Sequence, residues 1–299
     1  MSRQIDLILH GARGGEENMD LDREALARAE RGQASLRIYG WDRPTVSLGK
    51  SQRLEDVLDT FPNLPTVSRP SGGGAVLHGF DVTIALAMPL AMLGVAPRRL
   101  RDTYCRLITP LAEALDACGL RCHLAEDRRD RATPDCFASA GRIDLLGEGS
   151  ARKVAGCALV ATREAALLHA SVPATEPPVW LRLPPSTLAR YRNPVWRHDR
   201  FARALPAAWR DLGYDVRLAE LDPSLPPDQR ASAILWNELD PIGVNYALGA
   251  LDEYDDYAPS LTAASTVREI EAALLAMRRA MGISISADSK ALLQRLRGF

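Results

Sequence analysis

Residues Val67–His78 read VSRPSGGGAVLH, three glycines followed by an apolar run, and this is the most informative stretch of the chain. Because Gly72, Gly73 and Gly74 carry no Cβ, their amides can approach a ligand closely and their backbones can adopt positive φ angles. Arg69 places a planar cationic fork at the start of the loop. The pattern predicts a tight loop that leads into a buried strand and suits an anion or a carboxyl-derived group, although glycine triplets also serve as plain strand connections.

Three further motifs accompany this loop. The segment Leu36–Gln52 reads LRIYGWDRPTVSLGKSQ, Asn18–Asp22 reads NMDLD, and Cys136–Ser171 runs from CFASAGR to LLHAS. In this order and at these spacings, the four segments resemble the family of lipoate-protein ligases and octanoyltransferases, the acyl-transferring relatives of biotin ligases. The resemblance extends over roughly residues 15 to 175 and rests on the joint match of the segments rather than on any one of them.

The matching positions outside the glycine loop lie in the upstream and downstream segments. Upstream they are Arg37, Tyr39, Gly40, Trp41, Thr45, Ser47, Gly49 and Gln52. Downstream they are Cys136, Phe137, Arg152, Lys153, Gly156, Ala158, His169 and Ser171. The resemblance implies that Cys136 and Lys153 are catalytic. It also implies that the acyl group or another part of the substrate binds to Arg69, Ser71, Gly72, Gly73, Gly74, His78, Gly156 and His169.

The chemistry of the site depends on Cys136 and Lys153. A free thiol with a pKa of about 8.5 is only a few per cent thiolate at neutral pH, so a nucleophilic cysteine needs a nearby cation. Lys153 can provide that charge. The alternative is that Cys136 belongs to the core and that Lys153 faces solvent in a polar hairpin turn. We place Lys153 in such a turn, and its charge is then not needed for folding.

Three functions are compatible with these residues. The first is acyl transfer: Cys136 attacks an octanoyl thioester on acyl carrier protein, and the lysine of a lipoyl-domain acceptor aminolyses the acyl-enzyme without a cofactor. The second is an ATP-dependent lipoate-protein ligase, in which ATP and Mg²⁺ support formation of an acyl-adenylate held by the loop and Lys153. The third is a non-catalytic binder of acyl-carrier or lipoyl domains.

The third hypothesis arises because the sequence departs from the family pattern. Ser68 stands where many members have a second arginine, and Gly79 stands where they have aspartate. Leu168 replaces a glutamine before His169, and Ala170 replaces a glycine after it. Most of these changes remove polar groups from the expected site, so they bear on substrate identity and on activity itself.

Composition indicates a cytoplasmic enzyme. The chain has 299 residues, 46% of them hydrophobic and 25% charged, and its formal net charge of -1 argues against nucleic acid as an electrostatic partner. We expect no membrane partner, because no apolar run approaches the ~20 residues of a membrane span, and the N-terminus lacks a signal-peptide pattern. Five cysteines without a framework spacing fit reduced thiols. Cys118, Cys122 and His123 would need a fourth ligand to hold zinc, so we expect no metal site.

Alternating strands and helices predict an α+β fold with a mixed, largely antiparallel sheet flanked by helices, as the family resemblance also implies. The expected strands are Ile5–Leu9, Ser35–Ile38, Thr45–Leu48, Val82–Met88 and Arg121–Ala125, followed by a hairpin of Ile143–Leu146 and Val154–Thr162. The expected helices are Asn18–Glu30, with Asn18 as its cap, Pro97–Cys118 and Phe201–Leu212. The proline-rich stretch Pro173–Pro194 is expected to run over the surface.

Two domains are expected. Residues 1–222 form the acyl-transfer catalytic domain, and residues 223–299 form a small C-terminal module of unassigned function that contains the acidic residues Asp252, Glu253, Asp255 and Asp256. Two arginine groups are candidates for docking an acidic carrier protein. One comprises Arg98, Arg99, Arg101 and Arg106, with Arg98 and Arg101 on one face of the predicted helix; the other comprises Arg128, Arg129 and Arg131.

Overall fold

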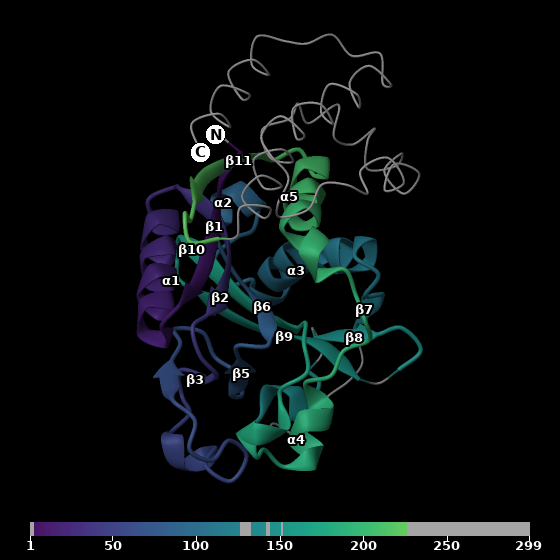
Figure 1. Cartoon of the computed structure of the whole chain (residues 1–299). Coiled ribbons are helices and arrows are strands. Elements are labelled where there is room, and N and C mark those ends of the chain that lie inside the picture. The colour runs from purple at the N-terminus through teal and green to yellow at the C-terminus, as the bar shows by residue number, and fades with distance from the viewer. Residues whose placement is uncertain (1–2, 126–132, 142–143, 151, 226–299) are drawn as a thin grey trace. The chain divides into compact units, whose positions relative to one another are not determined.

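The computed structural model describes residues 3–125, 133–141, 144–150 and 152–225 (Figure 1). The chain divides into two units, Met1–Glu220 and Leu221–Phe299, and the described residues belong almost entirely to the first. The expected C-terminal module, with its acidic residues, therefore lies outside the described residues except for 223–225. Arg128, Arg129 and Arg131 also lie outside them.

One eight-stranded sheet forms the centre of the first unit. In sheet order its strands are β11 (Asp215–Leu221), β1 (Gln4–Arg13), β2 (Ala34–Trp41), β6 (Asp81–Pro89), β10 (Ala165–Pro173), β9 (Lys153–Ala161), β8 (Leu145–Gly147) and β7 (Cys122–Leu124). Strands β1 and β2 are parallel, and each neighbouring pair from β2 to β7 is antiparallel. The expected α+β fold with a mixed, largely antiparallel sheet is confirmed.

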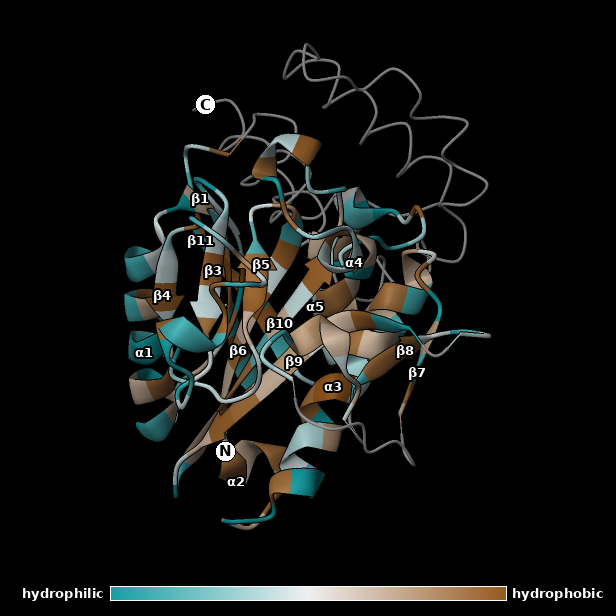
Figure 2. Cartoon of the chain, turned by 90° about the horizontal axis from the view of Figure 1, so that it is seen from below, coloured by the Kyte–Doolittle hydropathy of each residue, from teal (hydrophilic) through white to brown (hydrophobic). Residues whose placement is uncertain are grey.

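Helices cover both faces of this sheet. Helix α1 (Gly15–Glu30) packs on β2, β6 and β10, whereas α3 (Leu100–Ala117) and α5 (Phe201–Asp211) pack together on the other side (Figure 1). Two helices are short: α2 (Leu90–Leu93), which contacts β6, and α4 (Pro185–Arg190), which contacts the turn Cys136–Ala138. The central strands are strongly hydrophobic, while much of the surface of α1 is hydrophilic (Figure 2). Apolar burial between the layers therefore holds the sheet and helices together.

A second, three-stranded sheet carries the glycine loop. Its order is β4 (Thr66–Ser68), β3 (Thr45–Leu48) and β5 (Val76–His78), with β3 parallel to β4 and antiparallel to β5. The glycine-rich segment connects β4 to β5, and all three residues of β5 are buried. The prediction that the loop leads into a buried strand is confirmed, and β3 has the expected bounds.

Two local expectations are wrong. Asn18 is not a cap, because α1 begins at Gly15 and Asn18 lies in its first turn, where its side chain donates to Gly40 O at 3.1 Å. Helix α3 begins at Leu100, since Arg98 adopts a left-handed φ of 67°, so Arg98 and Arg101 do not share a helix face. Arg99 pairs with Asp102 at 2.8 Å.

The proline-rich stretch does not run wholly over the surface. Leu181, Leu183 and Tyr191 are buried in the same apolar cluster as Cys136, and Trp196 is also buried. The apolar residues between the prolines are stabilised when other side chains cover them and exclude water. This stretch therefore forms part of the core next to Cys136.

Within the described residues, no helix combines the length and apolar composition that crossing a bilayer requires. Those residues also contain no group of three or more His, Cys, Asp or Glu side chains arranged to hold a metal ion.

A buried polar network joins α1 to β1, β2 and β10. Arg37 donates from Nη1 to Asp22 Oδ1 at 2.8 Å and from Nε to His10 Nδ1 at 2.9 Å. Tyr39 donates its hydroxyl to Asp22 Oδ2 at 2.7 Å, and the Arg37 guanidinium lies over its ring. Because a buried charge is tolerated only when paired, these contacts fix how α1 sits on the sheet.

We expect His10 to make stability depend on pH. Burial lowers the pKa of His10, and the positive charge of Arg37 lowers it further. The hydrogen bond to Glu220 acts in the opposite direction. Below the pKa of about 6.5 in the unfolded chain, unfolding then takes up a proton, so the free energy of unfolding falls as the pH drops through that value. Between about pH 7.5 and 5.5, urea unfolding should show that His10→Asn loses less free energy of unfolding than the unaltered chain does. Parallel pH curves would contradict this.

Candidate active site

A narrow pocket opens between the large sheet and the glycine-loop sheet. Its walls come from α1, β2, β3, β5, β6, β9, β10 and the turn that carries Cys136. The lining residues are Met19, Tyr39, Trp41, Ser47, Arg69, Val76, His78, Thr83, Cys136, Gly156, Cys157, Ala158, His169, Ala170 and Ser171. Five predicted site residues, Arg69, His78, Cys136, Gly156 and His169, are among them. The pocket is mostly apolar with a few convergent polar groups, as expected of a small-molecule site.

Cys136 opens a 3₁₀ turn, Cys136–Ala138, that is joined to the end of the glycine loop. Its amide donates to Ala75 O at 2.9 Å, and the Ala75 amide donates to Pro134 O at 2.7 Å. Asp135 caps the turn, because its side chain accepts from the Phe137 amide at 2.9 Å. Two elements distant in the sequence thus position the thiol, which is 8% exposed.

Lys153 contacts the thiol directly. Its Nζ lies 3.2 Å from Cys136 Sγ, 3.1 Å from Cys136 O and 2.9 Å from Asp144 Oδ1. The residue is the first of β9 and 7% exposed, so the placement of Lys153 in the hairpin turn is wrong, and so is the alternative in which it faces solvent. Burial alone would lower the pKa of Lys153, but the charges and hydrogen bonds of Cys136 and Asp144 raise it above its ordinary value. Lys153 is therefore an ammonium held against the sulfur of Cys136.

Arg69 holds the glycine loop from inside. It donates from Nη1 to Ser47 O and Ser47 Oγ at 2.8 and 3.0 Å, and from Nη2 to Gly72 O and Gly74 O at 2.7 and 2.6 Å. Burial lowers the pKa of Arg69. Among the described residues, the amides of Gly72, Gly73 and Gly74 donate to no acceptor. The loop thus turns carbonyls toward Arg69 and keeps amide donors unused.

The loop glycines are expected to differ in their tolerance of a side chain. A Cβ on Gly74 would lie 2.8 Å from the Cys136 amide nitrogen, whereas a Cβ on Gly72 would meet nothing within 4 Å. Gly74→Ala should therefore lower the free energy of unfolding by about 2 kcal/mol, because backbone must move. Gly72→Ala is the matched control and should change it by less than about 0.5 kcal/mol. Denaturant unfolding of both variants checks this, and equal losses would show that the close approach does not constrain the turn.

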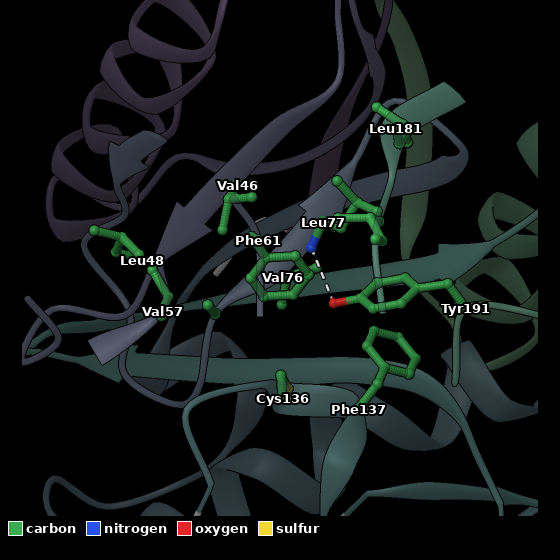
Figure 3. Packing of buried hydrophobic residues seen from close by; sticks show 12 residues of the cluster. Val46, Leu48, Val57, Phe61, Val76, Leu77, Cys136, Phe137, Leu181 and Tyr191 are labelled. Atoms are coloured by element: carbon green, nitrogen blue, oxygen red, sulfur yellow. Dashed lines mark hydrogen bonds between the residues drawn. The ribbon is translucent and has the colours of Figure 1, made fainter. Parts of the chain in front are cut away.

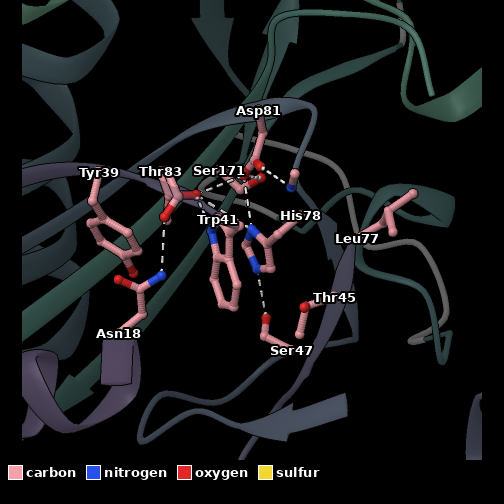
Figure 4. Close-up of polar contacts among 12 residues, drawn as sticks. Asn18, Tyr39, Trp41, Thr45, Ser47, Leu77, His78, Asp81, Thr83 and Ser171 are labelled. Carbon is pink, nitrogen blue, oxygen red and sulfur yellow. Dashed lines mark hydrogen bonds and ion pairs between the residues drawn. The ribbon is translucent and has the colours of Figure 1, made fainter. Parts of the chain in front are cut away.

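His78 is the centre of one chain of buried hydrogen bonds (Figure 4). Its Nδ1 lies 2.8 Å from Asp81 Oδ2 and its Nε2 lies 2.8 Å from Ser47 Oγ, so in the neutral ring Nδ1 donates and Ser47 donates to Nε2. The ring stacks on Trp41. Burial alone would raise the pKa of Asp81, but His78, Ser171 and Thr83 lower it. Asp81 therefore supplies a carboxylate near the position where Gly79 replaces the family's aspartate, and it also accepts from the Gly79 amide.

A second chain runs through His169. Ser71 Oγ lies 2.7 Å from His169 Nδ1, and His169 Nε2 lies 3.0 Å from Asp22 Oδ2, which can only accept. When the ring is neutral, Nε2 donates to Asp22 and Nδ1 accepts from Ser71. Burial would raise the pKa of Asp22, but His169, Arg37 and Tyr39 lower it below its ordinary value. Ser71 lies in the glycine loop, so this chain ties the loop to β10 and α1.

The apolar wall beside Cys136 is built by side chains from separate parts of the chain (Figure 3). Phe137 packs against Tyr191 with ring centroids 4.7 Å apart. Gly156 leaves room for this wall, since a Cβ there would lie 2.9 Å from the Phe137 ring and 3.5 Å from Cys136 Sγ. The close approach explains why the strand carries glycine at this point.

Several residues of the site were missed by sequence reasoning. Asp144, Asp135, Arg190 and Tyr191 all bear on the Cys136 turn or on Lys153. The role of Asp135 could have been predicted from the sequence, because an aspartate directly before a turn is a typical cap. The others had none, since they approach the site only through the tertiary fold.

Comparisons with known proteins show the family of this chain. The lipoyl protein ligase A/B catalytic domain family matches residues 15–175. The chain is 32% identical over 180 residues to octanoyltransferase LipM of Kyrpidia tusciae, covering 55% of this chain and 64% of that protein. It is 33% identical over 180 residues to octanoyltransferase LipM of Symbiobacterium thermophilum, covering 56% and 64%. The chain thus spans slightly less than two thirds of the length of these curated relatives.

Solved structures share the fold. A lipoate-protein ligase A bound with ATP superposes with a TM-score of 0.55 at 20% identity, covering 83% of this chain and 99% of that chain. A bipartite lipoate protein ligase from Thermoplasma acidophilum, studied with its E2 lipoyl domain, gives a TM-score of 0.53 at 18% identity, covering 83% and 97%.

Proposed function

This chain belongs to the family of lipoyl protein ligase A/B catalytic domains, and we propose that it is an octanoyltransferase that uses Cys136 as its acyl-accepting nucleophile. It moves an octanoyl or lipoyl group from a carrier-protein thioester to the lysine of a lipoyl-carrier domain. The observation that carries the proposal is the Lys153 ammonium 3.2 Å from Cys136 Sγ at a mostly apolar pocket. The similarity to octanoyltransferases supports the same chemistry.

The first half-reaction loads the enzyme. The Cys136 thiolate attacks the carbonyl carbon of the octanoyl thioester, and a new C–S bond forms. The tetrahedral intermediate collapses, the carbonyl–carrier sulfur bond breaks, and the leaving thiolate takes a proton from Lys153. The unused amides of the glycine loop, in particular Gly73 and Gly74, are the donors we assign to the transient oxyanion. The mostly apolar lining of the pocket is the surface that we assign to the alkyl chain.

The second half-reaction delivers the acyl group. The neutral amine of the acceptor lysine attacks the Cys136 thioester, the C–N bond forms, and the Cys136 thiolate leaves. The proton released by the amine returns to Lys153, which becomes an ammonium again. The side chain of Asp144, whose Oδ1 lies 2.9 Å from Lys153 Nζ, favours this return.

The ligase alternative requires the same residues to hold an acyl-adenylate, with ATP and Mg²⁺. A phosphate needs cationic donors, but here the three Nζ donors of Lys153 are engaged by Cys136 and Asp144. Arg69 is likewise engaged, by Ser47 and the loop carbonyls. Adenylate binding would break these contacts, so the arrangement favours transfer. The buried Cys136–Lys153 pair likewise favours catalysis over a purely binding role.

The experiment that separates the three functions is intact-mass analysis after mixing with octanoyl carrier protein, with and without ATP. An octanoyl adduct on the chain without ATP, which moves to a lipoyl-domain acceptor, is the expected result. Acceptor modification only with ATP would establish the ligase instead. Binding without either modification would leave the non-catalytic function.

A further inference from the structure

A segment late in the chain lies against the turn that carries Cys136. Residues Val179–Asn193, here called the strap, include α4 and lie within the proline-rich stretch. Its residues Leu181, Leu183 and Tyr191 are buried in one apolar cluster with Cys136 and Phe137 (Figure 3). The strap is anchored at its end, because Asn193 Nδ2 donates to Val154 O at 2.9 Å and to Pro173 O at 3.0 Å. It is therefore fixed to both strands beside the site.

The Tyr191 hydroxyl makes two hydrogen bonds that link separate parts of the site. It accepts from the Leu77 amide of β5 at 3.0 Å and donates to Asp135 Oδ1 at 3.3 Å. Tyr191 is 2% exposed, so neither bond competes with bulk water. One hydroxyl thus joins the strand after the glycine loop to the carboxylate that caps the Cys136 turn.

Asp135 receives a second donor from the strap. Its Oδ2 accepts from Arg190 Nη1 at 3.1 Å, while Oδ1 accepts from the Phe137 amide at 2.9 Å. Burial raises the pKa of Asp135, and the Phe137 amide, Arg190 and Tyr191 act against that rise. Removing either strap donor leaves a buried carboxylate with fewer partners, and such a group loses its charge more readily. A neutral Asp135 caps the turn less well.

We infer that Tyr191 and Arg190 are positioning residues for the proposed acyl transfer, on which this inference rests. Through Asp135 they hold the turn so that Cys136 Sγ stays in contact with the Lys153 ammonium. The other charged groups around the sulfur are Asp144, which pairs with Lys153, and Arg69, which is engaged by the loop carbonyls. None of them bonds the Asp135 carboxylate in the described residues, so the strap has no substitute there.

The test measures the alkylation of Cys136 by iodoacetamide against pH, followed by mass spectrometry of the peptide that contains Cys136. Tyr191→Phe removes only the hydroxyl and keeps the ring packing. Arg190→Gln removes the charge at a half-exposed position, so it remains informative if Tyr191→Phe fails to fold. Arg192→Gln is the matched control, since Arg192 pairs with Glu176 at 3.2 Å on the surface.

We expect the midpoint of the alkylation curve to move to higher pH by about half a unit or more in Tyr191→Phe and in Arg190→Gln. It should not move in Arg192→Gln. A variant that only changes how easily iodoacetamide reaches Cys136 multiplies the alkylation rate equally at every pH. The midpoint of its alkylation curve therefore stays in place. Unchanged midpoints in both strap variants would overturn the inference.

Failure of this inference can be told apart from failure of the proposed function. Alkylation needs no acyl substrate, so it tests the strap even if the chain transfers no octanoyl group. If the unaltered chain does transfer, Tyr191→Phe should lower kcat about tenfold with little change in KM for the carrier, because the strap acts on the nucleophile. An unchanged kcat together with an unchanged alkylation midpoint would remove the strap from the mechanism.

Discussion

Cys136→Ser is expected to fold normally, to form no octanoyl adduct and to lose transfer activity by about a thousandfold or more. Serine is close to cysteine in size and fits the 8% exposed site, so packing changes little. Its hydroxyl has a far higher pKa than a thiol, so the contact with Lys153 does not yield enough alkoxide to attack a thioester. Intact mass after incubation with octanoyl carrier protein measures the adduct, and transfer to a lipoyl domain measures the rate.

Cys157→Ser provides the control for this prediction. Cys157 also lines the pocket and is buried, but burial raises the pKa of its thiol well above the ordinary value, so it remains protonated. Its replacement should leave the octanoyl adduct intact. If Cys136→Ser kept full transfer activity, the covalent mechanism would be wrong and the ligase function would take its place.

Lys153→Met is expected to reduce transfer by about a hundredfold to a thousandfold, because the ammonium is the cation beside the sulfur and the proton donor for the leaving thiolate. It is also expected to lower the free energy of unfolding by about 3 kcal/mol, since it leaves the buried carboxylate of Asp144 without its partner. Steady-state transfer assays and thermal unfolding measure the two effects. The expectation from the sequence that this charge matters little for folding is thus corrected by the 2.9 Å ion pair with Asp144.

The double variant Lys153→Met, Asp144→Asn separates stability from catalysis. Asparagine keeps an acceptor for the Gly141 amide, which donates to Asp144 Oδ2, and it removes the unpaired charge. We expect most of the lost stability to return, because neutralising both partners of a buried pair is often tolerated. Activity should stay low. Recovery of transfer in the double variant would mean that Lys153 serves only to neutralise Asp144.

The class of fold and the choice of Cys136 and Lys153 as the proposed catalytic pair follow from the sequence. The alternation of Ile5–Leu9 in β1 and the apolar run Val82–Met88 in β6 depend on local residues, so these strands follow from the sequence. The glycine triplet and its flanking residues placed the loop, and the joint spacing of the motifs singled out Cys136 and Lys153. The strand and loop signals lie within short windows, where side-chain direction follows from the backbone geometry. The match of Cys136 and Lys153, in contrast, depends on four segments spread over roughly residues 15 to 175.

Only the tertiary structure decided how the site is held. Whether Lys153 faces solvent or Asp144 depends on the pairing of β8 with β9, and no local pattern encodes that pairing. Arg69 looked available for a substrate, yet packing turns it toward the loop carbonyls. Tyr191 and Arg190 reach Asp135 from more than fifty residues away along the chain. Burial makes such long-range partners obligatory, because a polar group without water must be satisfied by whatever the fold brings beside it.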